Sequence, residues 1–146
     1  MTGVQTCALP ILVLDSSVAL AWVYAEEVTG PIREVFQQIT KSGAWVPGIW
    51  RLEVANVLEA GARRGRHDAA FQQSTVADLA ALPIQTDAET DRHAWARTAA
   101  LATRHRLTTY DAAYLELALR RELPLATLDR ELRLAASAEK VALLGI

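Results

Sequence analysis

Short strand-like runs and longer helix-like segments alternate along most of the chain. Runs typical of buried parallel strands occupy 12–14, 44–46, 84–86, 125–128 and 141–144. Segments with helical spacing or helix-start signals occupy 18–24, 31–41, 49–64, 67–82, 88–105, 110–121 and 130–138. Strands that alternate with helices pair in parallel, and helices then cover both faces of the sheet. The pattern predicts a single α/β domain.

Length and composition agree with one folded domain. The chain has 146 residues, of which 51% are hydrophobic and 22% charged, which excludes a disordered tail. Its net charge of −2 excludes a polycation of the histone kind. No apolar run approaches the roughly 18–20 residues that span a bilayer, and the one cysteine, Cys7, cannot form an internal disulfide. We therefore expect a cytoplasmic protein without a membrane segment.

The first eleven residues read differently from the rest. The peptide TGVQTCALPI at 2–11 matches the translation of a common sequencing-library adapter, and it lacks the positive region of a signal peptide. We expect residues 1–11 to be a non-native segment and 12–146 to form the domain. An ordinary N-terminal tail is the alternative.

Two acidic residues follow predicted strands. Asp15 follows the run 12–14, and Asp129 follows the run 125–128. Ligands of open parallel sheets gather at the carboxyl ends of the strands, so both positions are candidates for a binding site. Each aspartate can instead cap the helix that begins there, by accepting a hydrogen bond from a free backbone N–H. Both interpretations stay open for each residue taken alone.

A third acid, Glu53, lies within a predicted helix. With residues spaced at 100° intervals, Trp50, Asn56 and Val57 fall within about 60° of Glu53 on the helix surface. This places the carboxylate on a largely apolar face. An unpaired carboxylate is costly there, so a buried arginine or a cation should lie beside it.

Asp111 repeats this pattern on another predicted helix. It shares a face with apolar side chains, whereas Glu116 and Arg120 are predicted to pair on the solvent side of the same helix. A capping box between Thr108 and Asp111 is the structural alternative.

Together the four acids predict a metal site. Clustered carboxylates repel one another, so at neutral pH they hold protons or bind hard cations. Oxygen ligands without cysteine or clustered histidine favour Mg²⁺ or Mn²⁺. Such ions can activate water and neutralise a scissile phosphate, which indicates phosphodiester hydrolysis. Ser16, Asn56 and Thr127 are candidates for orienting the ligands, although capping or ordinary hydrogen bonding explains each of them as well.

Three blocks carry a resemblance to a known family. LVLDSSVALAW, VPGIWRLEVANVLEAGARRGR and LTTYDAAYLELALRRELPLATLDREL, in this order and spacing, resemble the PIN-domain family and are most similar to its VapC-type toxins of bacterial toxin–antitoxin pairs. The resemblance covers nearly all of 12–146. It implies a three-layer fold with a five-stranded parallel sheet flanked by helices.

The resemblance also implies a function. Asp15, Glu53, Asp111 and Asp129 occupy the four acidic positions of the family, which hold Mg²⁺ or Mn²⁺ for hydrolysis of RNA. It further implies a tRNA or rRNA substrate, a homodimer and a cognate VapB-type antitoxin. A catalytically inactive PIN-like module that binds RNA or protein is the alternative.

Overall fold

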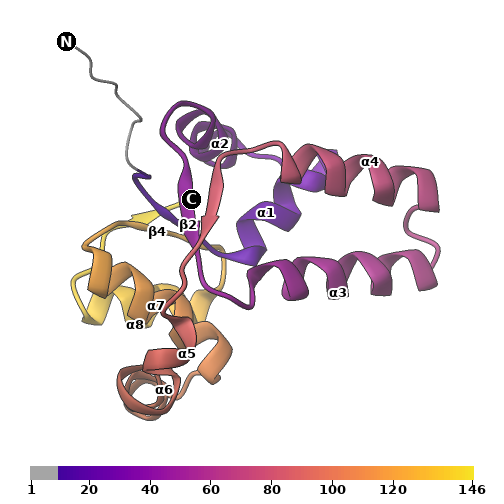
Figure 1. Cartoon of the computed structure of the whole chain (residues 1–146). Helices are drawn as coiled ribbons and strands as arrows, with labels where there is room; N and C mark the ends of the chain where they lie inside the picture. The colour runs from indigo at the N-terminus through magenta and orange to yellow at the C-terminus, as the bar shows by residue number, and fades with distance from the viewer. Residues whose placement is uncertain (1–9) are drawn as a thin grey trace.

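A five-stranded parallel sheet forms the centre of the protein (Figure 1). The structure is a computed structural model that describes residues 10–146, so most of the predicted N-terminal segment 1–11 lies outside the described residues. The strand order is β3-β2-β1-β4-β5, and every neighbouring pair is parallel. The strands are β1 (Val13–Leu14), β2 (Ala44–Val46), β3 (Ile84–Thr86), β4 (Leu125–Ala126) and β5 (Leu143–Leu144). The predicted α/β fold with a parallel five-stranded sheet is confirmed.

Helices cover both faces of this sheet. They are α1 (Ser16–Val23), α2 (Gly30–Ser42), α3 (Trp50–Arg63), α4 (Ala69–Ala80), α5 (Thr90–His93), α6 (Ala99–His105), α7 (Thr109–Arg121) and α8 (Arg130–Ala138). Figure 1 shows α1, α3 and α4 on one side of the sheet and α5 to α8 on the other. The predicted helix 88–105 is divided by a π-helical turn, η2 (Ala94–Thr98), and a short 3₁₀ turn, η1 (Ala25–Glu27), follows α1. No helix within residues 10–146 is long and apolar enough to cross a membrane.

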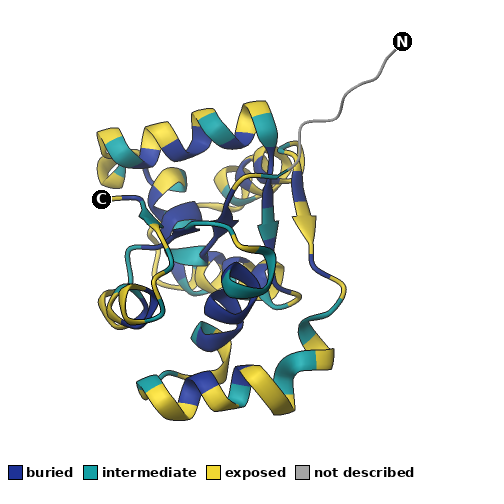
Figure 2. Cartoon of the chain, turned by 90° about the vertical axis from the view of Figure 1, so that its left-hand side faces the viewer, coloured by how far each residue is buried: buried dark blue, intermediate teal, exposed yellow. Residues whose placement is uncertain are grey.

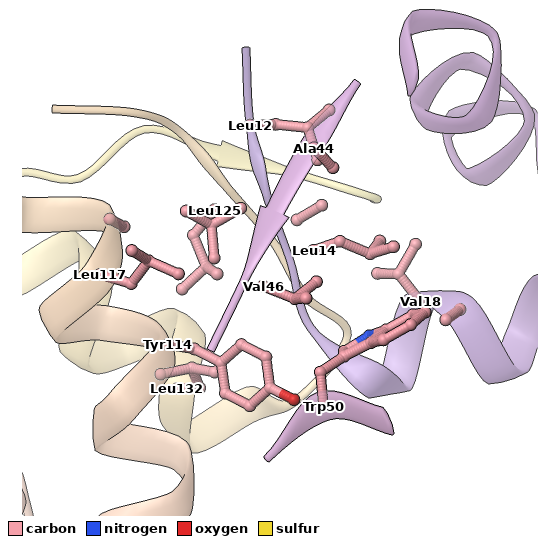
Figure 3. Close-up of a cluster of buried hydrophobic side chains, with 14 of the residues drawn as sticks. Leu12, Leu14, Val18, Ala44, Val46, Trp50, Tyr114, Leu117, Leu125 and Leu132 are labelled. Carbon is pink, nitrogen blue, oxygen red and sulfur yellow. The ribbon is translucent and has the colours of Figure 1, made fainter. Parts of the chain in front are cut away.

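The core is built on the central strands. Leu12, Val13 and Leu14 are fully buried, as are Leu125 and Ala126 on the neighbouring strand. Figure 3 shows the side chains of these strands meeting those of α7 and the start of α3. Buried residues concentrate on the central strands β1, β2 and β4 and on the inward faces of the helices, whereas the edge strands are partly exposed (Figure 2). The burial of this apolar surface supplies the main stabilisation of the fold.

Helices α3 and α4 form a hairpin that projects from the body of the molecule (Figure 1). The buried stripe of α3 consists of Trp50, Val54, Leu58 and Gly61. The sequence predicts a buried face that includes Val57. The observed buried face of α3 differs from it, because Val57 is 36% exposed. Glu53 lies beside the buried stripe and is half-buried.

Charged residues form a buried network between β3 and α7. Asp87, which follows β3, accepts hydrogen bonds from Arg120 at 2.7 and 3.1 Å and from Arg121 at 3.0 Å. Arg120 also donates to Glu116 at 2.8 Å, so the predicted pair exists. Its predicted solvent-side position is wrong, since Glu116 is only 1% exposed. The helices α5 and η2 pack against α7 and cover this side.

Removal of the central carboxylate should destabilise the fold. We expect Asp87→Ala to lower the free energy of unfolding by about 3 kcal/mol, because two arginines lose a buried partner. Urea denaturation measures this loss. Glu89→Ala is the control, since the side chain of this glutamate is 44% exposed and should contribute less than about 1 kcal/mol. Equal denaturation midpoints for Asp87→Ala and the wild type would contradict the assignment.

Candidate active site

Two of the four predicted acids meet at the carboxyl edge of the sheet. Strands β1 and β4 are direct parallel neighbours, with Leu14 in register with Ala126. Asp15 directly follows β1, and its N–H donates to the carbonyl of Ala126 at 3.0 Å. Asp129 follows β4 after two residues and begins α8. The parallel register therefore brings the two carboxylates to the same edge.

Hydroxyl groups hold the buried carboxylate of Asp15. Its Oδ2 accepts hydrogen bonds from Ser17 at 2.6 Å and from Thr127 at 2.7 Å. Ser17 also accepts from the backbone N–H of Leu128 at 2.9 Å, and Thr127 accepts from that of Asp129 at 3.0 Å. These bonds join the turn after β1 to the turn after β4. Thr127 was a predicted candidate for this role, whereas Ser17 was not.

Glu53 reaches the site from the first turn of α3. Its Oε1 accepts a hydrogen bond from the hydroxyl of Tyr114, which is completely buried on α7. The hydroxyl of Ser16 also stabilises the charged form of Glu53 and thereby opposes a rise in its pKa. The structure thus brings the candidate Ser16 next to Glu53, although Tyr114 is the stronger donor and was not predicted for this role.

Asp111 and Asp129 lie in the first turn and at the N-cap of their helices. The backbone N–H of Asp111 donates to Thr108 at 3.1 Å, and Asp129 Oδ1 accepts from the N–H of Leu132 at 2.8 Å. Asp129 therefore caps α8 and Thr108 caps α7, but only one half of the predicted capping box forms, since no hydrogen bond among the described residues joins the Thr108 N–H to the Asp111 carboxylate. The carboxylate of Asp15, by contrast, accepts no hydrogen bond from a backbone N–H of its helix. A capping role therefore leaves this buried carboxylate unexplained.

The four acids act on one another electrostatically. Burial is the main cause that raises the pKa of Asp15, and the charges of Glu53 and Asp129 raise it further. Burial also raises the pKa of Glu53, with a contribution from Asp111. The pKa of Asp111 is raised by burial and then by Asp129 and Asp15. In the described part of the chain no Lys, Arg or His forms a salt bridge with any of the four.

In three of these four carboxylates, one oxygen accepts a hydrogen bond from an uncharged donor. The held oxygens are Asp15 Oδ2, Glu53 Oε1 and Asp129 Oδ1. The negative charge is therefore oriented but not neutralised, which fits a hard divalent cation. Across residues 10–146, no three Asp, Glu, His or Cys side chains already surround a single point as ligands. The four acids are close enough for their charges to raise the pKa of Asp15, Glu53 and Asp111, and a bound ion would need water or substrate at its remaining ligand positions, as is usual for Mg²⁺.

Asn56 is the one candidate that the structure leaves apart. It is exposed on α3, and no hydrogen bond among the described residues joins its side chain to the acids. The buried stripe of α3 runs through Val54 and Leu58, so Asn56 points away from the body.

Comparison with known proteins agrees with this architecture. The profile of the PIN domain matches residues 12–138. The chain belongs to the PIN-domain family. Among solved structures, the PIN domain described here is similar to PAE2754 from Pyrobaculum aerophilum, with a TM-score of 0.68 and 25% identity over 92% of this chain and 83% of that one. No curated protein matches it. PIN domains are generally nucleases and usually use divalent metal ions.

Loss of one site charge should stabilise the metal-free protein. The folded-state pKa of Asp15 is raised by burial, so this carboxyl contributes stability at low pH that is lost as the pH rises through that pKa. In Asp15→Asn the side-chain oxygen can still accept from Ser17 and Thr127 without carrying charge. We expect the Tm of Asp15→Asn without metal to exceed that of the wild type by about 2–4 °C near neutral pH.

The pH dependence separates charge from packing. The Tm difference should shrink as the pH falls below the pKa of Asp15, since the wild-type carboxyl is then neutral too. Added Mn²⁺ should raise the Tm of the wild type more than that of the variant. A variant that is less stable at every pH would show that the charge of Asp15 costs the fold nothing.

Proposed function

We propose that this PIN domain is a Mg²⁺- or Mn²⁺-dependent endoribonuclease that hydrolyses phosphodiester bonds of RNA. The observation that carries the proposal is the electrostatic coupling of four carboxylates, none of which forms a salt bridge with a basic side chain in the described chain. Such an arrangement costs free energy in the absence of a cation. Uncompensated charge of this kind is typical of a binding site, and here it would bind a cation.

Each acid has a distinct means of support. Asp15 and Glu53 would hold the ions with their unbonded oxygens, while hydroxyl groups fix the other oxygen of each. Asp111 and Asp129 would complete the ligand set from the starts of α7 and α8. When bound, divalent ions supply a water of lowered pKa and positive charge at the phosphate.

The same acids make the reaction depend on metal. RNA is a polyanion, and four uncompensated carboxylates repel a phosphate that approaches them. The net charge of −2 gives the chain no general attraction for nucleic acid either. Productive binding of a phosphodiester in this pocket therefore requires the cation.

Substitution of one acid tests the activity. Asp111→Asn removes one ligand charge with little change in volume. The backbone N–H at position 111 still donates its hydrogen bond to Thr108. We expect Mn²⁺-dependent cleavage of a labelled single-stranded RNA to fall at least about 100-fold, while the circular dichroism spectrum is unchanged. Asp91→Asn on exposed α5 is the matched control and should cleave at the wild-type rate. Cleavage by Asp111→Asn at the wild-type rate, or cleavage in excess EDTA, would overturn the proposal.

We further propose that the enzyme is the toxin of a type II toxin–antitoxin pair. The resemblance of its sequence blocks to VapC-type toxins supports this role, with a tRNA or rRNA substrate, a homodimer and a VapB-type antitoxin in the cytoplasm. Exposed apolar side chains on the α3–α4 hairpin support a protein partner. Leu52 is 73% exposed and Val76 50% exposed, and a cleft of about 280 Å³ lies between the two helices.

Expression in bacteria tests the toxin role. Induced wild-type protein should arrest growth, and Asp111→Asn should not, because the arrest depends on cleavage. Co-expression of the small protein encoded next to the gene should restore growth. Normal growth with active, soluble enzyme present would exclude the toxin role and leave the nuclease activity standing.

The alternative is an inactive PIN domain that binds RNA or protein. It predicts RNA binding by the wild type without any metal-dependent cleavage. The mutual repulsion of the four acids argues against it, since a binding module does not need this repulsion.

A further inference from the structure

One tyrosine of the core extends to the candidate active site. Tyr114 on α7 is 0% exposed, and its ring is surrounded by the apolar side chains of the core. Figure 3 shows its hydroxyl directed toward the first turn of α3, where Trp50 lies. Glu53 belongs to the same turn and accepts the hydrogen bond from this hydroxyl.

Packing alone does not require that hydroxyl. Phenylalanine fills nearly the same volume and carries no buried polar atom, which would otherwise need a partner. The residue is a donor, because a phenol keeps its proton at neutral pH. A protonated phenol therefore faces Glu53 Oε1.

Glu53 needs such a restraint. Its side chain has three rotatable bonds, lies only half-buried and is repelled by the charge of Asp111. Without a donor inside the core, rotation toward solvent lowers both the desolvation cost and the repulsion. The hydrogen bond to Tyr114 opposes that rotation.

We propose that Tyr114 is a positioning residue for Glu53. Its hydroxyl occupies Oε1 and thereby leaves Oε2 free for a metal ion held by the site acids. The metal in this statement rests on the proposed function, whereas the orientation of Glu53 rests on the contact between the two side chains.

Two tyrosine-to-phenylalanine variants provide a matched test. Tyr24 is the control, since it is also buried and its hydroxyl hydrogen-bonds His67 at 3.2 Å. Among the described residues, no hydrogen bond or salt bridge joins Tyr24 or His67 to any of the four acids. We expect Tyr114→Phe to weaken Mn²⁺ binding in calorimetry by about 10–100-fold, and Tyr24→Phe to change it less than about twofold. Addition of Tyr114→Phe to Glu53→Gln should have little further effect, because the tyrosine acts through the carboxylate.

Crystal structures of the metal-free wild type and Tyr114→Phe separate this proposal from the proposed function. Glu53 should have one orientation in the wild type and turn toward solvent in the variant. The same orientation of Glu53 in both proteins, or equal Mn²⁺ affinity, would overturn the role of Tyr114. A wild type that binds no Mn²⁺ and cleaves no RNA would overturn the proposed function, and the orientation of Glu53 would still decide the positioning role.

Discussion

Repulsion between four carboxylates is the constraint on which the rest of the site depends. Parallel β1 and β4 bring Asp15 and Asp129 to one edge of the sheet, and the first turns of α3 and α7 add Glu53 and Asp111. Burial raises the pKa of three of them and the neighbouring charges raise it further. The folded chain thus stores an electrostatic cost that a bound cation relieves.

The hydrogen-bond donors around these carboxylates do not remove the repulsion between them. Ser17, Thr127 and Tyr114 donate neutral hydrogen bonds, which orient the carboxylates and leave their charge intact. Arg120 and Arg121 do not neutralise these acids, because both bind Asp87 at the far end of α7. Neutralised acids stabilise the junction of β3 and α7, and uncompensated acids form the site.

Much of this could be predicted from the sequence, because it follows from local order. The alternation of strands and helices gives the parallel sheet, and acids placed directly after strands or on helix starts give the candidate ligands. Thr127 could be named as a candidate donor, but the acid to which it bonds and the roles of Ser17 and Tyr114 could not be predicted. Thr127 lies 112 residues from Asp15 and Tyr114 lies 61 residues from Glu53, and such pairs depend on how the helices pack. The same limit explains the burial of Glu116 and the displaced stripe of α3, because packing partners determine which helix face is buried.

Diffraction from crystals soaked in Mn²⁺ tests the central claim most directly. The account predicts an anomalous peak in the pocket between Asp15, Glu53, Asp111 and Asp129, with at least two of the carboxylates at coordination distance and water at the other positions. A crystal with no peak among these acids at saturating Mn²⁺ would contradict it.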